Sequence, residues 1–283
     1  MKQRLISAGV GIVLLTIVLI LHRTFVFPVA LALIVCIILF ELIRAIGGLE
    51  FKLATGGVLA YGILNIILTG LFTILDLSVK QFVMIDKIHS ALLPICISFV
   101  FWDYMRHPKN FLVEQGAFMI ASMILVQYSF QFLLMLNSEE HGLFYVILGL
   151  CGAWIADSGA YFAGVALGKH KLCPEISPKK TIEGFVGGLI SNAILFALIF
   201  LIYAKCNSMN FTILQGLRSA LLGLVCAGIS VLGDLTASVI KRQKNIKDYG
   251  NIMPGHGGLM DRFDSVLFVL PAFYTCMQLF PIF

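Results

Sequence analysis

Long apolar runs recur along almost the whole chain and constrain its fold more than any other feature. Each run has about 20 residues, the length that an α-helix needs to cross the hydrocarbon core of a bilayer. Of the 283 residues, 59% are hydrophobic and only 12% are charged, which excludes an ordinary soluble domain. We therefore expect an all-α, polytopic integral membrane protein.

Nine apolar windows, each bounded by charged or turn residues, predict nine transmembrane helices. The windows are 5–21, 25–43, 53–75, 88–105, 111–136, 141–168, 184–204, 212–240 and 262–282. The first run follows Lys2 and Arg4, as in a signal peptide, but no convincing small-residue cleavage site precedes the next run. We therefore expect the first run to be retained as a span.

The basic residues indicate an orientation, because cytoplasmic loops of membrane proteins collect Lys and Arg. With a cytoplasmic N-terminus, 15 of the 20 basic residues fall on the cytoplasmic side, four fall outside and Arg218 lies within a span. The net charge of +5 thus reflects topology, and we expect no nucleic-acid partner, because the chain has no compact basic domain. The seven cysteines are scattered and form no CxxC pair, so we expect small buried side chains rather than disulfides or a zinc site.

Two polar segments interrupt the apolar pattern, and on the expected topology both face the cytoplasm. They read GKHKLCPEISPKKTIEGFVGG, 168–188, and SVIKRQKNIKDYGNIMPGHGGLMDRFDS, 238–265. Clustered Lys among turn residues is typical of sites that neutralise phosphate charge. Each segment adjoins an apolar helix that carries an acid, Asp157 or Asp234, and an ionisable group at membrane depth costs roughly 2.5 kcal/mol or more. Such acids tend to face a functional cavity; the alternative is simple pairing with a neighbouring Lys or backbone donor.

The carboxylates of the second segment favour a hard divalent cation. Asp261 and Asp264 are three residues apart at the start of the last expected helix, so both should project toward one face. Asp234 lies on the preceding helix, against which the intervening loop can fold. Mg²⁺ commonly takes one or two carboxylates with waters and substrate phosphates, which suits so sparse a set. His256 is a weaker candidate ligand, with a phosphate donor or a loop brace as its alternative roles.

A glycine-rich turn, GHGG at 255–258, precedes this last helix. Glycines let a backbone approach a phosphate closely, and a helix N-terminus offers free N–H groups and a positive dipole end. Such a turn is weak evidence alone. The case for a phosphate site becomes stronger because the turn lies between two charged motifs, KRxxxxKD and DRxD.

The stretch SVIKRQKNIKDYGNIMPGHGGLMDRFD closely resembles the signature of phosphatidate cytidylyltransferases, also called CDP-diacylglycerol synthases. Three further stretches also resemble that family: DSGAYFAG, 157–164, the whole 168–188 segment, and GDLTASVIKR, 233–242. Met253 stands where the pattern usually has Leu, Ile or Phe, and it keeps an apolar side chain. The resemblance is dense over 150–265, so we divide the chain into N-terminal transmembrane helices, 1–140, and a C-terminal transmembrane catalytic region, 141–283, within a single membrane-embedded unit.

The resemblance implies transfer of CMP from CTP to phosphatidic acid, giving CDP-diacylglycerol and pyrophosphate, with Mg²⁺ as the cofactor. It places Mg²⁺ on Asp234 and Asp261, with Asp264 on the ion or beside its ligands. The implied catalytic residues are Lys241, Arg242, Lys247, Asp248 and Asp264. The implied substrate-binding residues are Asp157, Ser177, Lys179, Lys180, Thr181, Glu183, Gly255, His256, Gly257, Gly258 and Arg262.

The implied partners are CTP, phosphatidic acid and the lipid bilayer, and a homo-oligomer is left open. We expect a bacterial inner-membrane protein with a cytoplasmic N-terminus and cytoplasmic active-site loops. Glu41 and Asp103 are expected at the membrane interface, with a contribution to lipid access as the alternative. A CTP-dependent lipid-alcohol kinase would need similar groups. A transporter would also carry intramembrane acids, but often in two repeated halves, and no repeat is visible.

Overall fold

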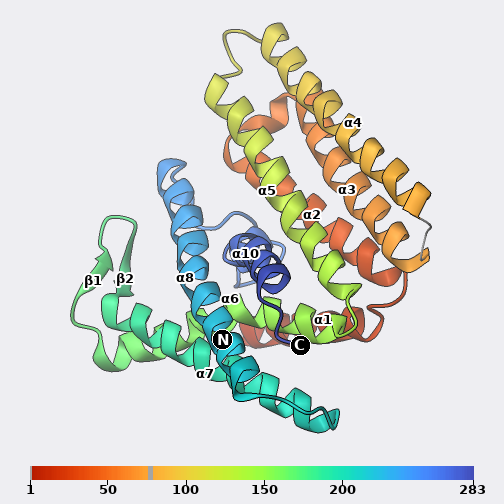
Figure 1. Ribbon diagram of the computed structural model, residues 1–283. Coiled ribbons are helices and arrows are strands. Elements are labelled where there is room, and N and C mark those ends of the chain that lie inside the picture. The colour runs from red at the N-terminus through yellow and green to blue at the C-terminus, as the bar shows by residue number, and fades with distance from the viewer. Residues whose placement is uncertain (1, 76–78) are drawn as a thin grey trace. The chain divides into compact units, whose positions relative to one another are not determined.

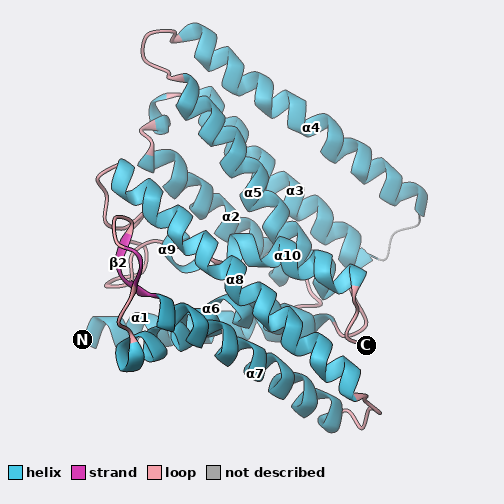
Figure 2. Ribbon diagram, turned by 60° about the vertical axis from the view of Figure 1, so that its left-hand side comes forward, coloured by secondary structure: helices cyan, strands magenta, loops and turns pink. Residues whose placement is uncertain are grey.

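Most of the structure is helical (Figures 1 and 2). It is a computed structural model that describes residues 2–75 and 79–283, with the side chains of 2–5 and 79–86 left out of the description. The basic residues Lys2, Arg4 and Lys80 lie outside the described side chains. The elements are α1 (Lys2–Ile20), α2 (Val26–Ala45), η1 (Gly48–Glu50), α3 (Lys52–Leu75), α4 (Val79–Arg106), α5 (Val113–Asn137), α6 (Gly142–Leu167), β1 (Lys171–Cys173), β2 (Ser177–Thr181), α7 (Ile182–Cys206), α8 (Ile213–Gln243), α9 (Met260–Phe263) and α10 (Val266–Leu279).

Seven of the described helices are long and apolar enough to cross a membrane, which confirms the all-α polytopic class. They are α2 to α8, with α4 counted from Lys87. The expected count of nine differs only at the two ends of the chain. The apolar part of α1, Ile6–Ile20, is shorter than a span. The expected helix 262–282 is divided by a turn at Asp264 and Ser265, which leaves α10 with 14 residues, about 21 Å against the ~30 Å of a hydrocarbon core.

The chain folds into two compact units, which are interleaved along the sequence. The first unit comprises Met1–Ser138 and Lys244–Arg262, and the second comprises Glu139–Gln243 and Phe263–Phe283. Most of the signature segment therefore packs with the N-terminal helices, although it follows the second unit's main helices in the chain. The functional division into 1–140 and 141–283 stays a prediction.

In the first unit, α2 packs against α3 and α5, and α3 also packs against α4 and α5 (Figure 1). The helices approach closely because glycines lie at their contacts. A Cβ at Gly62 would overlap the side chains of Val35 and Leu39, both fully buried. Close packing at small residues is a common way for membrane helices to associate, since lipid leaves little hydrophobic force between them.

In the second unit, α6, α7 and α8 form a bundle that α10 completes. The backbones of α6 and α7 are so close that a Cβ at Gly187 would overlap Ala163. The buried Asn192 of α7 fixes the bundle, because its Nδ2 donates to the carbonyl oxygens of Gly152, at 3.1 Å, and Gly223, at 2.8 Å. These three helices therefore provide a rigid base for the polar groups at their ends.

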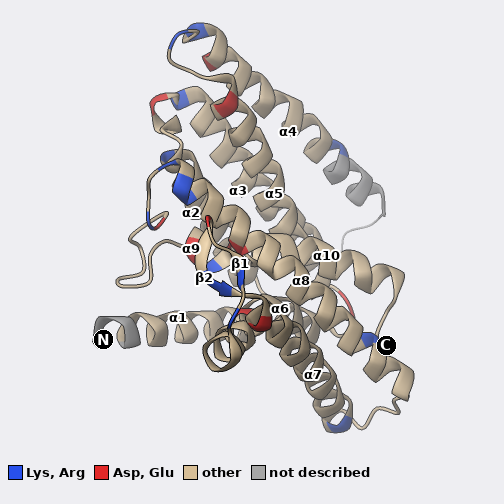
Figure 3. Cartoon of the chain, turned by 90° about the vertical axis from the view of Figure 1, so that its left-hand side faces the viewer, with Lys and Arg blue, Asp and Glu red and all other residues tan. Residues whose placement is uncertain are grey.

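Charged residues gather near helix ends and in loops, and the helix bodies carry few of them (Figure 3). Asp157 on α6 and Asp234 on α8 are exceptions, because they lie within their helices. Among the cysteines, Cys96 and Cys226 are buried as expected, whereas Cys206 at the end of α7 is exposed. The prediction of small buried cysteines is thus right for only part of the set.

Candidate active site

The glycine-rich part of the signature forms a tight turn in the first unit. The N–H of Met253 donates to the carbonyl of Gly257 at 3.0 Å, and the N–H of His256 donates to the carbonyl of Met253 at 2.8 Å. Gly255 and Gly257 have φ values of 78° and 88°, in the left-handed region where a side chain is unfavourable. The turn geometry by itself therefore requires glycine at both positions.

Asp261 closes this loop on itself from the first turn of α9. The side chain is buried, and its Oδ2 accepts hydrogen bonds from the N–H of Tyr249, at 2.7 Å, and from the N–H of Gly258, at 3.0 Å. One carboxylate oxygen of a predicted metal ligand is thus already engaged by the backbone. Its metal role stays a prediction, and a structural role stands beside it.

Glu41 of α2 is a second buried acid that holds the same loop, and the sequence did not predict this role. Only 1% of Glu41 is exposed. Its Oε1 accepts from the N–H of Leu259 at 3.2 Å, and its Oε2 accepts from the N–H of Met260 at 2.8 Å. One turn further along α2, Arg44 Nη2 donates to the carbonyl of Tyr249 at 2.5 Å. An acid and a base on α2 therefore fix the two ends of the loop.

These contacts correct the expectation that the start of the last helix offers free N–H groups to a phosphate. The N–H groups of Gly258, Leu259 and Met260 donate to Asp261 and Glu41 instead. Unpaired donors at a helix start need acceptors when they are buried, and carboxylates supply them here. Asp103, the other acid expected at the interface, is also buried, and it accepts from the N–H of Ala54 at 2.8 Å.

His256 is braced by α1. Ser7 Oγ lies 3.0 Å from the carbonyl oxygen of Pro254 and 2.8 Å from Nδ1 of His256. A hydroxyl has a single proton, so if Ser7 donates it to Pro254, its oxygen accepts from an N–H at Nδ1. The geometry supports the loop-brace role among the alternatives weighed for His256.

The second unit holds three neighbouring aspartates of the predicted set, Asp157, Asp234 and Asp264. Asp264 lies in the turn before α10, outside the seven spans, and its Oδ1 accepts from the N–H of Ser265 at 2.7 Å. Ser265 Oγ in turn lies 3.5 Å from Asp157 Oδ2. The pKa of Asp264 is raised to about 7, mainly by burial and also by the negative charges of Asp234 and Asp157, while the N–H of Ser265 and the charge of Lys241 lower it. The acids are crowded enough to favour a nearby cation.

Lys180 supplies a positive charge to this group. Its Nζ lies 2.5 Å from Asp234 Oδ2, and each side chain is 26% exposed. The nitrogen atom itself is buried, so water screens the pair only in part. Lys180 projects from β2, which pairs antiparallel with β1 in a hairpin between α6 and α7.

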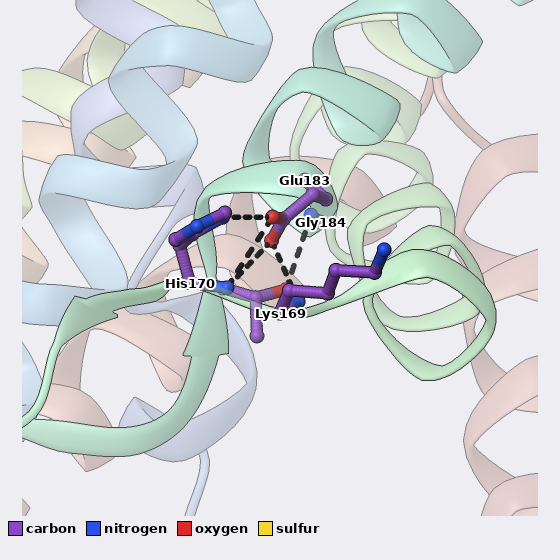
Figure 4. A network of polar contacts seen from close by, with 5 residues as sticks. Lys169, His170, Glu183 and Gly184 are labelled. Atoms are coloured by element: carbon purple, nitrogen blue, oxygen red, sulfur yellow. Dashed lines mark hydrogen bonds and ion pairs between the residues drawn. The ribbon is translucent and has the colours of Figure 1, made fainter.

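The base of the hairpin is fixed to α7 by two further residues predicted to bind substrate. Glu183 accepts from the N–H groups of Lys169 and His170 and from His170 Nδ1, the last at 2.6 Å (Figure 4). Thr181 caps α7, because its Oγ1 accepts from the N–H of Gly184 at 3.1 Å. Both side chains thus have structural partners, and their contact with substrate stays a prediction.

The remaining predicted residues lie at helix ends, in loops and on β2. Lys241 and Arg242 belong to the last turn of α8, with Lys241 half-buried and Arg242 exposed. Ser177 begins β2 and is half-buried. The exposed members of the set are Lys179, Lys247, Asp248 and Arg262. Lys180 and Lys241 therefore share the second unit with the three acids, whereas Lys247, Asp248, Asp261 and Arg262 belong to the first.

The donor chemistry fits a hard cation whose coordination is completed by other groups. Within the described residues, no cluster of three or more His, Cys, Asp or Glu side chains is arranged to hold a metal ion. Asp234 already binds a cationic nitrogen, however, and Asp264 lies close enough to be affected by its charge. Mg²⁺ needs only one or two carboxylates where substrate phosphates supply further oxygens.

Comparison with known proteins places these residues in a family. The cytidylyltransferase family model matches residues 2–280. The chain is 38% identical over 196 residues to the phosphatidate cytidylyltransferase of Bacillus subtilis (strain 168), which covers 69% of this chain and 70% of the relative. It is 41% identical over 178 residues to the phosphatidate cytidylyltransferase of Staphylococcus saprophyticus and 43% identical over 178 residues to that of Staphylococcus aureus (strain COL). Each of these two alignments covers 62% of this chain and 65% of the relative. The chain therefore belongs to the cytidylyltransferase family.

Proposed function

We propose that this protein transfers CMP from CTP to phosphatidic acid, giving CDP-diacylglycerol and pyrophosphate for phospholipid synthesis. The observation that carries the proposal is the group formed by Lys180, Asp234, Asp264 and Lys241 in a chain of this family. Acids and lysines gathered at one place suit a reaction among phosphates and a divalent cation. The relatives named phosphatidate cytidylyltransferase support the same substrates.

The reaction requires positioning more than acid–base chemistry. A phosphate oxygen of the lipid forms a bond to the α-phosphorus of CTP, and the bond from that phosphorus to the β-phosphate oxygen breaks, so that pyrophosphate leaves. A phosphomonoester is already nucleophilic and needs no strong base. We assign Lys241, Arg242 and Lys247 to neutralising the phosphates, because fixed positive charges act on the charge that develops in the transition state.

Mg²⁺ is proposed as the cofactor, held by Asp234 and Asp261 with Asp264 on the ion or beside its ligands. Asp234 and Asp264 have the support of their shared electrostatics. Asp261 has the family resemblance in its favour and a competing role in its own loop. When bound, the ion would neutralise substrate phosphate charge.

We propose that the protein lies in a bacterial inner membrane with both polar segments open to the cytoplasm. Two spans, α7 and α8, separate the hairpin from the signature segment along the chain, so both face the same side whether or not α1 and α10 cross. Cysteines placed at positions 179 and 247 in a cysteine-free background should react from the cytoplasm. Nine spans put Phe283 outside, and labelling of position 283 from the cytoplasm would contradict that count.

One product assay tests the activity. Purified protein is incubated with labelled CTP, phosphatidic acid and Mg²⁺, and both products are followed. CDP-lipid with pyrophosphate is expected, whereas phosphorylated lipid with CDP would indicate the lipid-alcohol kinase, and uptake of a solute into proteoliposomes without CTP would indicate a transporter. A homo-oligomer is compatible with this function, and cross-linking in the same proteoliposomes would detect it.

A further inference from the structure

The ion pair between Lys180 and Asp234 joins a lysine of the hairpin to a proposed metal ligand. The two side chains meet at 2.5 Å, and the lysine nitrogen is buried. A cation bound to Asp234 through the same oxygen would have to displace this ammonium group. The pair therefore bears directly on how a metal ion reaches the site.

We propose, on the basis of the proposed function, that Lys180 is a resident counter-cation. It neutralises Asp234 until nucleotide and metal arrive together, and its ammonium group then pairs with the nucleotide phosphates. Lysine suits this exchange, because its ammonium is a compact point charge on a flexible stem. An arginine or a backbone N–H would be harder to displace.

The position of Lys180 on the hairpin selects it over its neighbour. Successive side chains of a strand point to opposite faces, and Lys179 is exposed while the Lys180 nitrogen is buried against Asp234. The hairpin has one strand of three residues and one of five, with an irregular register between Lys171 and Cys173. A ribbon this small is marginally stable alone, so Lys180 can change partners without disturbing the helix bundle.

The charges around Asp234 explain why such a counter-cation is needed. Asp234 and Asp157 both act on the buried Asp264, and Lys241 opposes them. Withdrawing Lys180 without a replacement would leave three neighbouring acids opposed by the charge of Lys241. The exchange is therefore expected to be coupled, with the lysine leaving Asp234 only as a metal ion takes its place. One consequence is that free metal binds weakly in the absence of nucleotide.

Metal binding without nucleotide tests this directly. Full-length protein in detergent micelles is titrated with Mn²⁺, and the free ion is measured by electron paramagnetic resonance. Lys180→Met should bind Mn²⁺ at least about fivefold more tightly than the wild type, a difference of ~1 kcal/mol. Lys180→Arg, which keeps the charge and is harder to displace, should bind it no more tightly than the wild type. Lys171→Met, on the other strand of the hairpin, is the matched control and should leave the affinity for Mn²⁺ unchanged.

A second titration follows the other half of the exchange. Adding a CTP analogue with a non-hydrolysable α,β-bridge should tighten Mn²⁺ binding by the wild type, and Lys180→Met should bind that analogue more weakly in EDTA. Unchanged or weaker Mn²⁺ binding by folded Lys180→Met, checked by circular dichroism, overturns the inference. If Lys180→Met fails to fold, Lys180→Gln is judged by the same criterion.

Failure of this inference can be told apart from failure of the proposed function. If Asp234→Asn leaves Mn²⁺ binding intact, Asp234 is not a metal ligand and the counter-cation role of Lys180 is wrong. Product formation by the wild type would still establish the activity in that case. If the wild type makes no CDP-diacylglycerol, the function fails, whatever the metal titration gives.

Discussion

Glu41 and Asp261 of the first unit and Asp234 of the second unit are held by different kinds of donor. In the first unit, Glu41 and Asp261 accept hydrogen bonds from backbone N–H groups of the signature segment. In the second unit, Asp234 pairs with the side-chain ammonium of Lys180. Backbone donors cannot leave without unfolding the loop, whereas an ammonium on a flexible stem can be replaced. The comparison teaches that Glu41 and Asp261 fix the shape of the signature segment, whereas Asp234 has an exchangeable partner.

Replacing the proposed metal ligands should have the largest effect and would test the comparison most severely. Asp234→Asn and Asp261→Asn should each lower CDP-diacylglycerol formation by about 1000-fold, ~4 kcal/mol in the barrier, because Asn keeps the shape but loses the charge that binds a dication. Residues that serve one ion act as a unit, so the double variant should be little worse than either single one. The assay is repeated over a Mg²⁺ titration, with thermal stability measured in detergent. Near-normal activity of Asp261→Asn with an unchanged Mg²⁺ midpoint would assign Asp261 to the loop alone.

Removing Glu41 should mainly affect stability. Glu41→Ala leaves the N–H groups of Leu259 and Met260 without their acceptor and should lower the free energy of unfolding by about 2–4 kcal/mol. Glu41→Gln keeps an acceptor oxygen and should lower it by about half as much. Thermal unfolding in detergent measures both, with Glu114→Gln, an exposed acid at the start of α5, as the control. Equal stability of Glu41→Ala and the control would show that α2 does not hold the loop.

Lys241 tests whether charge in the second unit acts on substrate. Lys241→Ala should lower turnover tenfold or more, ~1.4 kcal/mol in the barrier, with the protein still inserted and folded. Lys244→Ala, an exposed lysine in the same polar segment, is the control. Turnover within about threefold of the wild type, ~0.7 kcal/mol, would make Lys241 a topology charge.

Thr181 should give the smallest effect and separates capping from substrate contact. Thr181→Ala removes the acceptor for the N–H of Gly184 and should destabilise the protein by about 1 kcal/mol, and Thr181→Ser should restore most of this. Stability comes from thermal unfolding and KM from the product assay. A rise in KM for CTP that Thr181→Ser does not reverse would contradict a role limited to capping.

Much of the fold could be predicted because its signals are local. Seven expected spans correspond to α2 to α8, since a continuous apolar run specifies a membrane helix without reference to any partner. The prediction was less accurate at the two ends. The apolar window 262–282 contains a turn at Asp264 and Ser265, which the hydropathy averaged over the window does not reveal.

The sequence by itself determined the membrane class, the gathering of polar residues in two segments and the family, because these depend on composition and on short motifs. Only the tertiary structure decided which donors Glu41 and Asp234 meet. Glu41 lies 218 residues before Leu259, and no local pattern connects them. Lys179 and Lys180 are neighbours of the same type, yet the packing of the hairpin directs only Lys180 to Asp234. Such pairings arise when helices pack, and packing depends on the whole chain at once.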